Sequence, residues 1–408
     1  LGYVGLPLAV GLSSSYKIIG FDISLERVSQ LIKGIDQTLE VKREKLKGCL
    51  RKNLKLTNNL NDLKDCNIFI ATVPTPITKS LKPDLRPLKN VCKSIASLIK
   101  KHDIVVFEST VYPGATEEVC LPILEKNKRK LKAGKDFFLG YSPERVNPGD
   151  RVHSIDKIDK VISGQNKSVE KVLNEVYSKL TTGRIFIAKN IKVAEASKVI
   201  ENSQRDINIA FINEVAKICN KLDISVYDVL DASKTKWNFL PFQPGLVGGH
   251  CIGVDPYYLS FKSSKLKVNP KVILSGRKTN DEMPSVIAKN INKKLKNKSR
   301  ILFLGMTFKE DVPDIRNSKS FQLVSLLKKK NHKVELHDPF VVSKHLDLIE
   351  FKEIKNNSFD GVILAVPHKF YLKNIKKIKK FIKDKGILFD IKGKLRFANK
   401  SGLQYWSL

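Results

Sequence analysis

The chain has 408 residues, of which 42% are hydrophobic, so it is long enough for two or three domains and can bury a core. Its net charge of +33 comes mostly from Lys, which favours a solvated surface, because proteins that read base edges depend on Arg. No apolar run approaches the ~20 residues of a membrane span, and the six scattered cysteines form no CxxC pair. We therefore expect a cytoplasmic protein without membrane insertion, a bound metal or a specific nucleic-acid partner.

Residues 1–190 alternate short β-rich runs with helical stretches. This alternation predicts an α/β domain with a doubly wound parallel sheet covered on both faces. A helix is expected over residues 93–100, between two of the strands. The predicted strands are residues 17–22, 67–73, 103–108, 137–141, 160–163 and 184–188.

The first residues fit part of a dinucleotide fingerprint, in which GxGxxG joins a strand to a helix. Gly2 and Gly5 fit its second and third glycines, and Asp22 closes the next strand, where it can accept hydrogen bonds from ribose hydroxyls. Arg27 is predicted to meet the cofactor. A plain tight helix entry would explain the two glycines alone, but the position of Asp22 favours dinucleotide binding. The first glycine and the first strand are absent, so we expect the sequence to be truncated at its start.

Polar residues follow three more predicted strands. Thr75 lies in the segment TVPTP, Thr110 lies in ESTVYPG, and Glu144 and Arg145 lie in GYSPERVNPG. Because ligands of parallel sheets bind outside the carboxyl ends of the strands, these residues are candidates for a ligand crevice. Each Thr taken singly could equally cap a helix.

A central domain is predicted over residues 191–285, and it opens with a long helix over 191–222 that contains neither Pro nor Gly. Lys198, Asn202 and Arg205 stand at positions i, i+4 and i+7, which is one face of a helix. This pattern leaves two interpretations open. The polar stripe is either a solvated face or a site for an anionic or oxyanionic ligand.

The Gly/Pro-rich loop 241–256 is the most informative stretch of the sequence. Its residues 244–256 read PGLVGGHCIGVDP, and the glycines, including Gly248, allow a ligand to approach the backbone closely. Cys251 and Asp255 are four residues apart, so they share a face on a helical turn. A cation near such a thiol increases the reactive thiolate fraction, and Lys198 of the long helix is the predicted partner, which makes Cys251 a candidate nucleophile.

Residues 286–408 predict a second doubly wound domain, with strands at 300–305, 333–337, 361–366 and 386–390 and a helix at 318–330. Lys309 follows the first of these strands, and Arg316 precedes the helix. Lys309 together with the helix N-terminus is suited to holding a diphosphate.

In chain order, the motifs GYVGLP, TVPTP, ESTVYPG, GYSPERVNPG, the helix from Glu195 to Arg205, GGHCIGVDP and GMTFKEDVPDIRNS closely resemble the UDP-glucose/GDP-mannose dehydrogenase family over nearly the whole chain. The stretch from Lys236 to Cys251 looks most like the UDP-N-acetylhexosamine 6-dehydrogenases of surface-polysaccharide pathways. The resemblance implies two Rossmann-like domains joined by a long central helix. It also implies a homodimer built through that helix.

The resemblance further implies an NAD-dependent four-electron oxidation of the C6 hydroxyl of a UDP-sugar to a uronate. Cys251 would form a thiohemiacetal and then a thioester, and Glu144 would assist acid–base steps of its hydrolysis. Lys198 and Asn202 would stabilise oxyanions, while Asp255 and Thr110 would position water. The implied substrate-binding residues are Arg145, Val146, Lys198, Asn202, Arg205, Gly248 and Lys309. The implied NAD-binding residues are Gly2, Tyr3, Val4, Gly5, Asp22, Arg27, Thr75, Thr110 and Arg316.

Two alternatives come from other classes of protein. A two-electron hydroxyacid dehydrogenase of the 6-phosphogluconate type would share the Rossmann domain, the long helix and a Lys–Asn pair, but would need neither Cys251 nor a second Rossmann-like domain. A basic nucleic-acid-binding protein with a nucleotide fold would bind polyanions in a salt-sensitive way and show no turnover.

Overall fold

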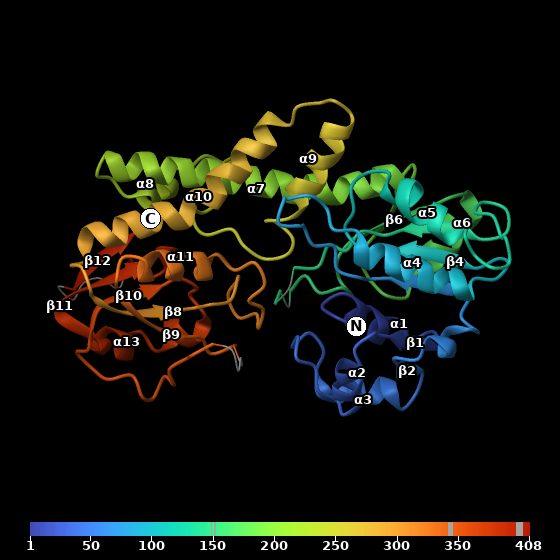
Figure 1. Cartoon of the computed structure of the whole chain (residues 1–408), viewed down its shortest axis with the longest axis horizontal. Coiled ribbons are helices and arrows are strands. Elements are labelled where there is room, and N and C mark those ends of the chain that lie inside the picture. The colour runs from blue at the N-terminus through green and yellow to red at the C-terminus, as the bar shows by residue number, and fades with distance from the viewer. Residues whose placement is uncertain (148, 151, 342–345, 397–402) are drawn as a thin grey trace. The chain divides into compact units, whose positions relative to one another are not determined.

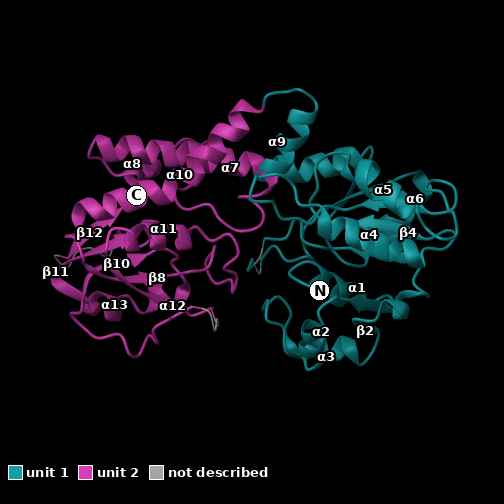
Figure 2. Ribbon diagram, viewed as in Figure 1, with its two compact units in different colours: residues 1–202, 257–269 teal, residues 203–256, 270–408 magenta. Residues whose placement is uncertain are grey.

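The computed structural model describes residues 1–147, 149–150, 152–341, 346–396 and 403–408. The chain forms two compact units, which Figure 2 colours separately. Unit 1 comprises residues 1–202 and 257–269, and unit 2 comprises residues 203–256 and 270–408. The long helix α7 (Ile191–Lys221) begins in the first unit and ends in the second, and α9 (Asp255–Lys265) begins where the chain returns to unit 1.

Unit 1 contains a two-stranded parallel sheet and a five-stranded sheet with the order β3-β4-β5-β6-β7 (Figure 1). The β4 strand is buried at all four positions, as expected for a strand covered on both faces. The strands are β1 (Ile18–Phe21), β2 (Leu54–Thr57), β3 (Ile68–Ala71), β4 (Ile104–Phe107), β5 (Phe138–Tyr141), β6 (Lys160–Gly164) and β7 (Ile185–Ile187).

One pairing differs from the predicted all-parallel sheet. Strands β5 and β6 run antiparallel, with Gly140 opposite Gly164 and Tyr141 opposite Ser163. A parallel pair needs a crossover, usually a helix, whereas the described residues between these two strands contain no helix. The irregular segment after β5 instead carries the Glu144 and Arg145 motif.

Helices cover the sheets of unit 1. Leu8 and Leu12 of α1 pack with Leu173 and Tyr177 of α6 on the five-stranded sheet, while the opposite side of α1 packs on the two-stranded sheet. Asn166 caps the N-terminus of α6 by accepting a hydrogen bond from the backbone of Val169. The helices are α1 (Gly5–Leu12), α2 (Leu25–Ile32), α3 (Arg43–Leu50), α4 (Arg86–Leu98), α5 (Leu121–Leu124) and α6 (Lys167–Ser178).

Unit 2 is built on one five-stranded parallel sheet with the order β12-β11-β10-β8-β9. Its strands are β8 (Arg300–Leu304), β9 (Lys333–His337), β10 (Phe359–Leu364), β11 (Ile382–Asp390) and β12 (Gln404–Ser407). Strand β8 lies inside the sheet, between β10 and β9, so the loop that follows it, which carries Lys309, lies at the carboxyl edge of the sheet.

Two apolar clusters flank the sheet of unit 2. One contains Met283 and Ile287 of α10 and Leu323 of α11, and the other contains Ile378 and Phe381 of α13. The helices are α8 (Val226–Ser233), α10 (Lys271–Lys294), α11 (Lys319–Lys328), α12 (Lys369–Lys373) and α13 (Ile375–Phe381).

The predicted α/β class is confirmed, and the predicted long helix agrees with α7 to within one residue. The sequence reading missed β2, β12 and α10. Strand β2 has only four residues, and Pro284 inside α10 obscures its helical pattern. Helix α4 starts at Arg86, earlier than predicted, with Pro87 in its first turn. No helix among the described residues has the length and apolar character needed to cross a bilayer.

Candidate active site

The two glycines at the start of the chain have different surroundings. A Cβ atom on Gly5 would lie 2.5 Å from the side-chain oxygen of Thr72, so only glycine permits this approach of α1 to the end of β3. A Cβ on Gly2 would meet nothing within 4 Å. These are the requirements of a fingerprint whose third glycine packs the helix and whose second glycine leaves room for a pyrophosphate. Tyr3 and Val4 lie between them.

Asp22 and Arg27 take different places. Asp22 directly follows β1, and its Oδ1 accepts a hydrogen bond from the backbone N–H of Ser24 at 2.9 Å, which leads into α2. The Arg27 guanidinium lies 2.8 Å from Asp36 Oδ1. Asp36 in turn accepts hydrogen bonds from the backbone of Thr38 and Val41, so in this structure Arg27 supports the loop after α2.

The loops after β3 and β4 are joined by hydrogen bonds. The Ser109 hydroxyl donates to the Val73 carbonyl at 2.6 Å, and the buried Tyr141 hydroxyl donates to the Ser109 carbonyl at 3.2 Å. Thr75 and Thr110, both half-buried, lie on these two loops. The carboxyl ends of β3, β4 and β5 therefore form one connected edge, as predicted.

The first turns of α7 hold the loop after β4. The Glu195 carboxylate, which is fully buried, accepts hydrogen bonds from the backbone N–H groups of Gly114 and Thr116. Burial raises the pKa of Glu195 to about 7, against the lowering effect of the Thr116 and Gly114 hydrogen bonds. Lys198 lies three residues further along the same helix and is itself buried.

The segment after β5 also contacts α7. The Glu144 carboxylate accepts a hydrogen bond from the backbone N–H of Val146, and Arg145 Nη2 lies 3.1 Å from Glu201 Oε1. Glu201 adjoins Asn202, which is half-buried. Unit 1 thus brings Glu144, Arg145 and Val146 to the helix that carries Lys198 and Asn202.

In unit 2, the cysteine loop is held by the second half of α7 and by α10. Asn213 Nδ2 donates to the Gly245 carbonyl at 3.0 Å, and Gly245 N–H donates back to Asn213 Oδ1 at 2.8 Å. Asn280 accepts from the same Asn213 amide at 2.8 Å and donates to Asp206. These buried amides fix the start of the loop, and the sequence reading assigned none of them.

The cysteine loop packs directly on the loop after β8. A Cβ on Gly248 would lie 2.7 Å from the Asn317 carbonyl, and one on Gly249 would lie 2.6 Å from the Phe308 ring. Gly249 also has φ = +84°, in the region that favours glycine. The GG pair is therefore required for close packing of the Cys251 segment on the Lys309 segment.

Cys251 is half-buried, at the turn before α9. The backbone N–H of Asp255 donates to the Cys251 carbonyl at 2.9 Å, which is the i to i−4 bond of a helical turn. Cys251 and Asp255 therefore share one turn, as predicted. Lys198 belongs to unit 1 and Cys251 to unit 2, so their proposed pairing stays a prediction.

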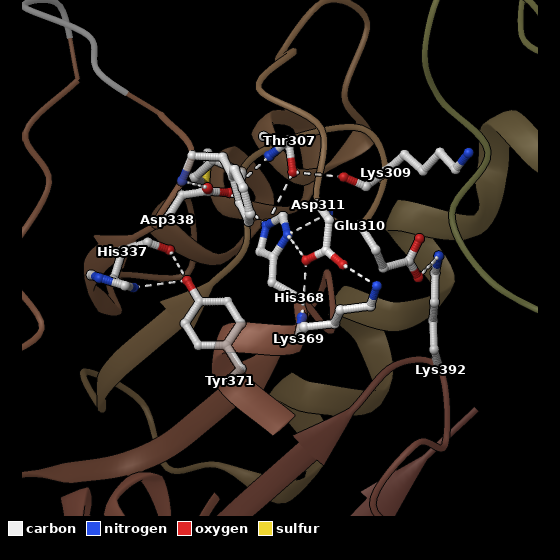
Figure 3. Close-up of polar contacts among 12 residues, drawn as sticks. Thr307, Lys309, Glu310, Asp311, His337, Asp338, His368, Lys369, Tyr371 and Lys392 are labelled. Carbon is white, nitrogen blue, oxygen red and sulfur yellow. Dashed lines mark hydrogen bonds and ion pairs between the residues drawn. The ribbon is translucent and has the colours of Figure 1, made fainter. Parts of the chain in front are cut away.

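A buried polar network holds the Lys309 loop (Figure 3). Asp338 Oδ2 accepts from the backbone N–H groups of Met306 at 2.6 Å and Thr307 at 3.1 Å. His368 Nδ1 accepts from the Asp311 N–H at 2.9 Å, and His368 Nε2 lies 3.2 Å from Asp338 Oδ2. An acceptor at Nδ1 places the ring proton on Nε2, so a neutral His368 can donate to the Asp338 carboxylate.

A second pair lies beside this network. The Tyr371 hydroxyl donates to the His337 carbonyl at 2.7 Å and lies 2.8 Å from His337 Nδ1. The His337 ring packs against Phe351 and Phe370, at centroid distances of 5.2 and 5.9 Å. Burial lowers the pKa of His337 to about 4, so the imidazole is neutral at physiological pH.

The remaining predicted residues lie in unit 2. Arg316 forms a 2.6 Å ion pair with Asp314, which follows the Lys309 loop. Arg205 is exposed on α7. Among the described residues, His, Cys, Asp and Glu side chains form no group of three or more suited to a metal ion.

The sequence reading did not assign Lys160, Tyr177, Glu195, Asp338 or His368. Lys160 and His368 carried a usable signal, because a Lys opens an otherwise apolar predicted strand and a His follows another strand within four residues. Tyr177 carried none, since it is an ordinary residue within a helical pattern, and Glu195 was named only as the first residue of a family motif, without a role.

Comparison with known proteins identifies the chain in three consecutive segments. Residues 1–181 match the NAD binding domain of the UDP-glucose/GDP-mannose dehydrogenase family, residues 192–282 its central domain, and residues 302–396 its UDP binding domain.

Individual proteins are similar over almost their whole length. Protein CapL from Staphylococcus aureus is 50% identical over 96% of this chain and 94% of its own. A UDP-N-acetyl-D-glucosamine 6-dehydrogenase from Pseudomonas aeruginosa is 46% identical over 96% and 95%. The structure of a UDP-D-ManNAc dehydrogenase from Pyrococcus horikoshii matches with a TM-score of 0.90 and 29% identity, covering 100% of this chain and 97% of that one. The chain therefore belongs to the UDP-glucose/GDP-mannose dehydrogenase family and is an NAD-dependent oxidoreductase.

Proposed function

We propose that this enzyme oxidises the C6 hydroxyl of a UDP-N-acetylhexosamine to the carboxylate, in two steps, through a covalent intermediate on Cys251. The substrate class is proposed from the relatives from Pseudomonas aeruginosa and Salmonella typhi, both named UDP-N-acetyl-D-glucosamine 6-dehydrogenase. Because NAD and nucleotide sugars are cytoplasmic metabolites, we place the reaction in the cytoplasm. The uronate formed would serve as a polysaccharide precursor.

The single observation that carries this proposal is the packing of the Cys251 loop on the Lys309 loop within unit 2. The latter follows strand β8, which pairs with β10 and β9, in the segment that matches the UDP binding domain. A diphosphate held by Lys309 would lie at the carboxyl edge of the sheet, and the contacts of Gly248 and Gly249 bring the thiol-bearing loop to the same edge. A nucleophile held beside the nucleotide end suits chemistry on the attached sugar.

The residues of unit 1 suit the supporting roles. Gly2, Gly5 and Asp22 fit a bound dinucleotide, and NAD accepts the hydride in each of the two oxidations. Lys198 and Asn202 would stabilise the alkoxide and the tetrahedral oxyanions. The thiol of Cys251 adds to the aldehyde carbon to give a thiohemiacetal, and oxidation of that adduct gives a thioester. Glu144, with Thr110 and Asp255, would prepare the water that releases the product.

The surface of α7 supports a homodimer. Val193, Ile200, Phe211 and Ile218 are all exposed, and Phe211 is 62% exposed. At about 100° per residue, spacings of seven, eleven and seven place them in one stripe along the helix. Lys198, Asn202 and Arg205 fall on the opposite side. We propose that a second copy of the chain covers the stripe. Phe211→Lys should then yield monomers in analytical ultracentrifugation, and an unchanged mass would exclude this interface.

The experiment that tests the function measures NADH release from a panel of UDP-N-acetylglucosamine, UDP-N-acetylgalactosamine, UDP-N-acetylmannosamine and UDP-glucose. The best substrate should give two NADH per sugar consumed, and Cys251→Ala should abolish uronate formation while NAD binding persists. Cys66→Ala, at another half-buried cysteine, is the matched control and should retain activity. One NADH per sugar would favour a two-electron dehydrogenase, and uronate production by Cys251→Ala would exclude the thioester route.

A further inference from the structure

Unit 1 contains a buried charge cluster at the ends of three strands. Lys160 opens β6, Glu108 follows β4, and Glu144 lies in the segment after β5. Lys160 Nζ lies 2.9 Å from Glu108 Oε2 and 3.7 Å from Glu144 Oε2, and the Lys160 and Glu108 side chains are both 0% exposed. Removing charges from water costs several kcal/mol per ion, so a buried cluster of this kind is weak as a device for stability.

The two carboxylates differ in how completely they are hydrogen-bonded. Both oxygens of Glu108 have partners, because Lys160 donates to one and the Tyr177 hydroxyl donates to the other. In Glu144, Oε1 accepts from the backbone of Val146, but the buried Oε2 accepts no hydrogen bond from any described residue. The second oxygen of Glu144 thus faces a cation 3.7 Å away and retains its capacity to accept a proton.

The cluster holds one ammonium and two carboxyl groups. Burial raises the pKa of Glu108, against the lowering effect of Lys160. Burial by itself lowers the pKa of Lys160, but Glu108 and Glu144 together raise it above its ordinary value. Lys160 therefore stays an ammonium, and the two carboxyl groups compete for it.

Other charged groups near Glu144 are already paired. Arg145 forms its ion pair with Glu201 of α7 and donates to the Asp159 carbonyl at 3.2 Å. Tyr177 of α6 is committed to Glu108, and burial raises its pKa well above the ordinary value, so it remains neutral. Among the described residues packed around Glu144, Lys160 is the cation directed at its carboxylate.

We infer that Lys160 is a positioning residue: it orients the Glu144 carboxylate for its proposed part in hydrolysis of the Cys251 thioester, while Glu108 competes for the same ammonium group. This inference rests on the proposed function. In the step concerned, the water oxygen bonds to the thioester carbon, and its proton passes to Glu144. The C–S bond breaks with its electron pair on the Cys251 sulfur, and the proton of the resulting acid goes to the thiolate or to solvent.

The test compares Lys160→Met, Lys160→Arg and Glu108→Gln, with Lys157→Met as a control at an exposed lysine on the same segment. With the best substrate of the panel, Lys160→Met should still release a rapid burst of two NADH per subunit. The following steady state should fall about 100-fold, because hydrolysis is impaired. Intact-mass spectrometry should detect the sugar nucleotide bound to the protein.

The pH dependence of the hydrolysis rate distinguishes this role from a purely structural one, because a structural residue would not change it. Its acid limb should shift upward by about one to three pH units in Lys160→Met, and downward in Glu108→Gln. Lys160→Arg should restore most of the rate. In Lys160→Met, kcat/KM for the UDP-sugar should change little, because the steps before thioester hydrolysis are unaffected.

Lys160→Met leaves two buried carboxyl groups without a cation, so this variant can fail to fold. The double variant Lys160→Met/Glu108→Gln removes one charge of each sign and should fold while still accumulating the adduct. Wild-type hydrolysis in the double variant, or loss of substrate binding with an unchanged pH profile, would overturn the inference. If the wild-type enzyme itself released no NADH, the proposed function would fail instead.

Discussion

Each of the two units buries a polar cluster at the edge of its sheet where parallel strands end, and in unit 1 the antiparallel strand β6 begins at that edge with Lys160, but the clusters are built differently. In unit 1, Lys160 is shared between Glu108 and Glu144, and one carboxylate oxygen accepts no hydrogen bond from the described residues. In unit 2, Asp338 accepts from three backbone N–H groups and lies beside His368, whose two ring nitrogens both have partners.

The difference indicates two uses of buried polarity. A fully satisfied network rigidifies the backbone around it, which suits a loop that must hold a diphosphate in one place. A charged cluster with an open acceptor is costly to keep, and such perturbed groups concentrate where protons are transferred. The unit 2 network is therefore suited to holding a loop in place, and the unit 1 cluster is suited to proton transfer.

The largest expected effect is a change of stability with pH, because burial shifts the pKa of His337 in unit 2 downward and that of Glu108 in unit 1 upward. His337 has its pKa lowered to about 4 by burial, from an ordinary 6.5, so its contribution to stability is present above pH 6.5 and is lost as the pH falls toward 4. The free energy of unfolding should fall by up to about 3 kcal/mol over that range. Glu108 has a raised pKa, so its contribution has the opposite sign and is lost as the pH rises.

Urea unfolding at pH 7 and pH 4.5 measures this loss, and His337→Phe should remove it, because the ring of Phe does not titrate. Other carboxyl groups titrate near pH 4.5 in both proteins, so the difference between them isolates His337. Equal losses of unfolding free energy in wild type and variant would mean that the folded state takes up the proton on His337 at pH 4.5 without the predicted cost.

A smaller effect is expected at Lys309. A charge-assisted hydrogen bond to a phosphate contributes about 1.5–3 kcal/mol, so Lys309→Ala should lower kcat/KM for the UDP-sugar by about 10- to 100-fold and leave NAD binding unchanged. Lys369→Ala is the control, since the Lys369 side chain is 84% exposed and its ammonium lies 3.8 Å from Asp311 Oδ2 of the same loop. If both variants lowered kcat/KM for the UDP-sugar equally, Lys309 would have no specific role in holding the diphosphate.

The smallest effect is expected at Asp22. Its loss removes hydrogen bonds to the ribose, so Asp22→Ala should raise KM for NAD by about tenfold, which corresponds to roughly 1.4 kcal/mol. Affinity for the UDP-sugar should not change, because that site is proposed in unit 2. Asp65→Ala, at an exposed aspartate of unit 1, is the matched control. An unchanged KM for NAD would mean that Asp22 does not bind the ribose.

The sequence by itself determined the α/β class, the family and the long helix α7, because hydrophobic periodicity and glycine-containing motifs are local signals. It also predicted that Cys251 and Asp255 share a helical turn, since a spacing of four residues decides that. The residues of the motifs could be named as candidates without any coordinates.

Only the tertiary structure decided which side chains meet. Lys160 opens a strand, Glu108 follows another strand and Tyr177 lies in a helix, at separations of up to 69 positions, and no local pattern encodes such a contact. The Asp338–His368 pair and the exposed apolar stripe of α7 are of the same kind. Contacts and exposure depend on how the elements pack, and packing is a property of the whole chain rather than of any segment.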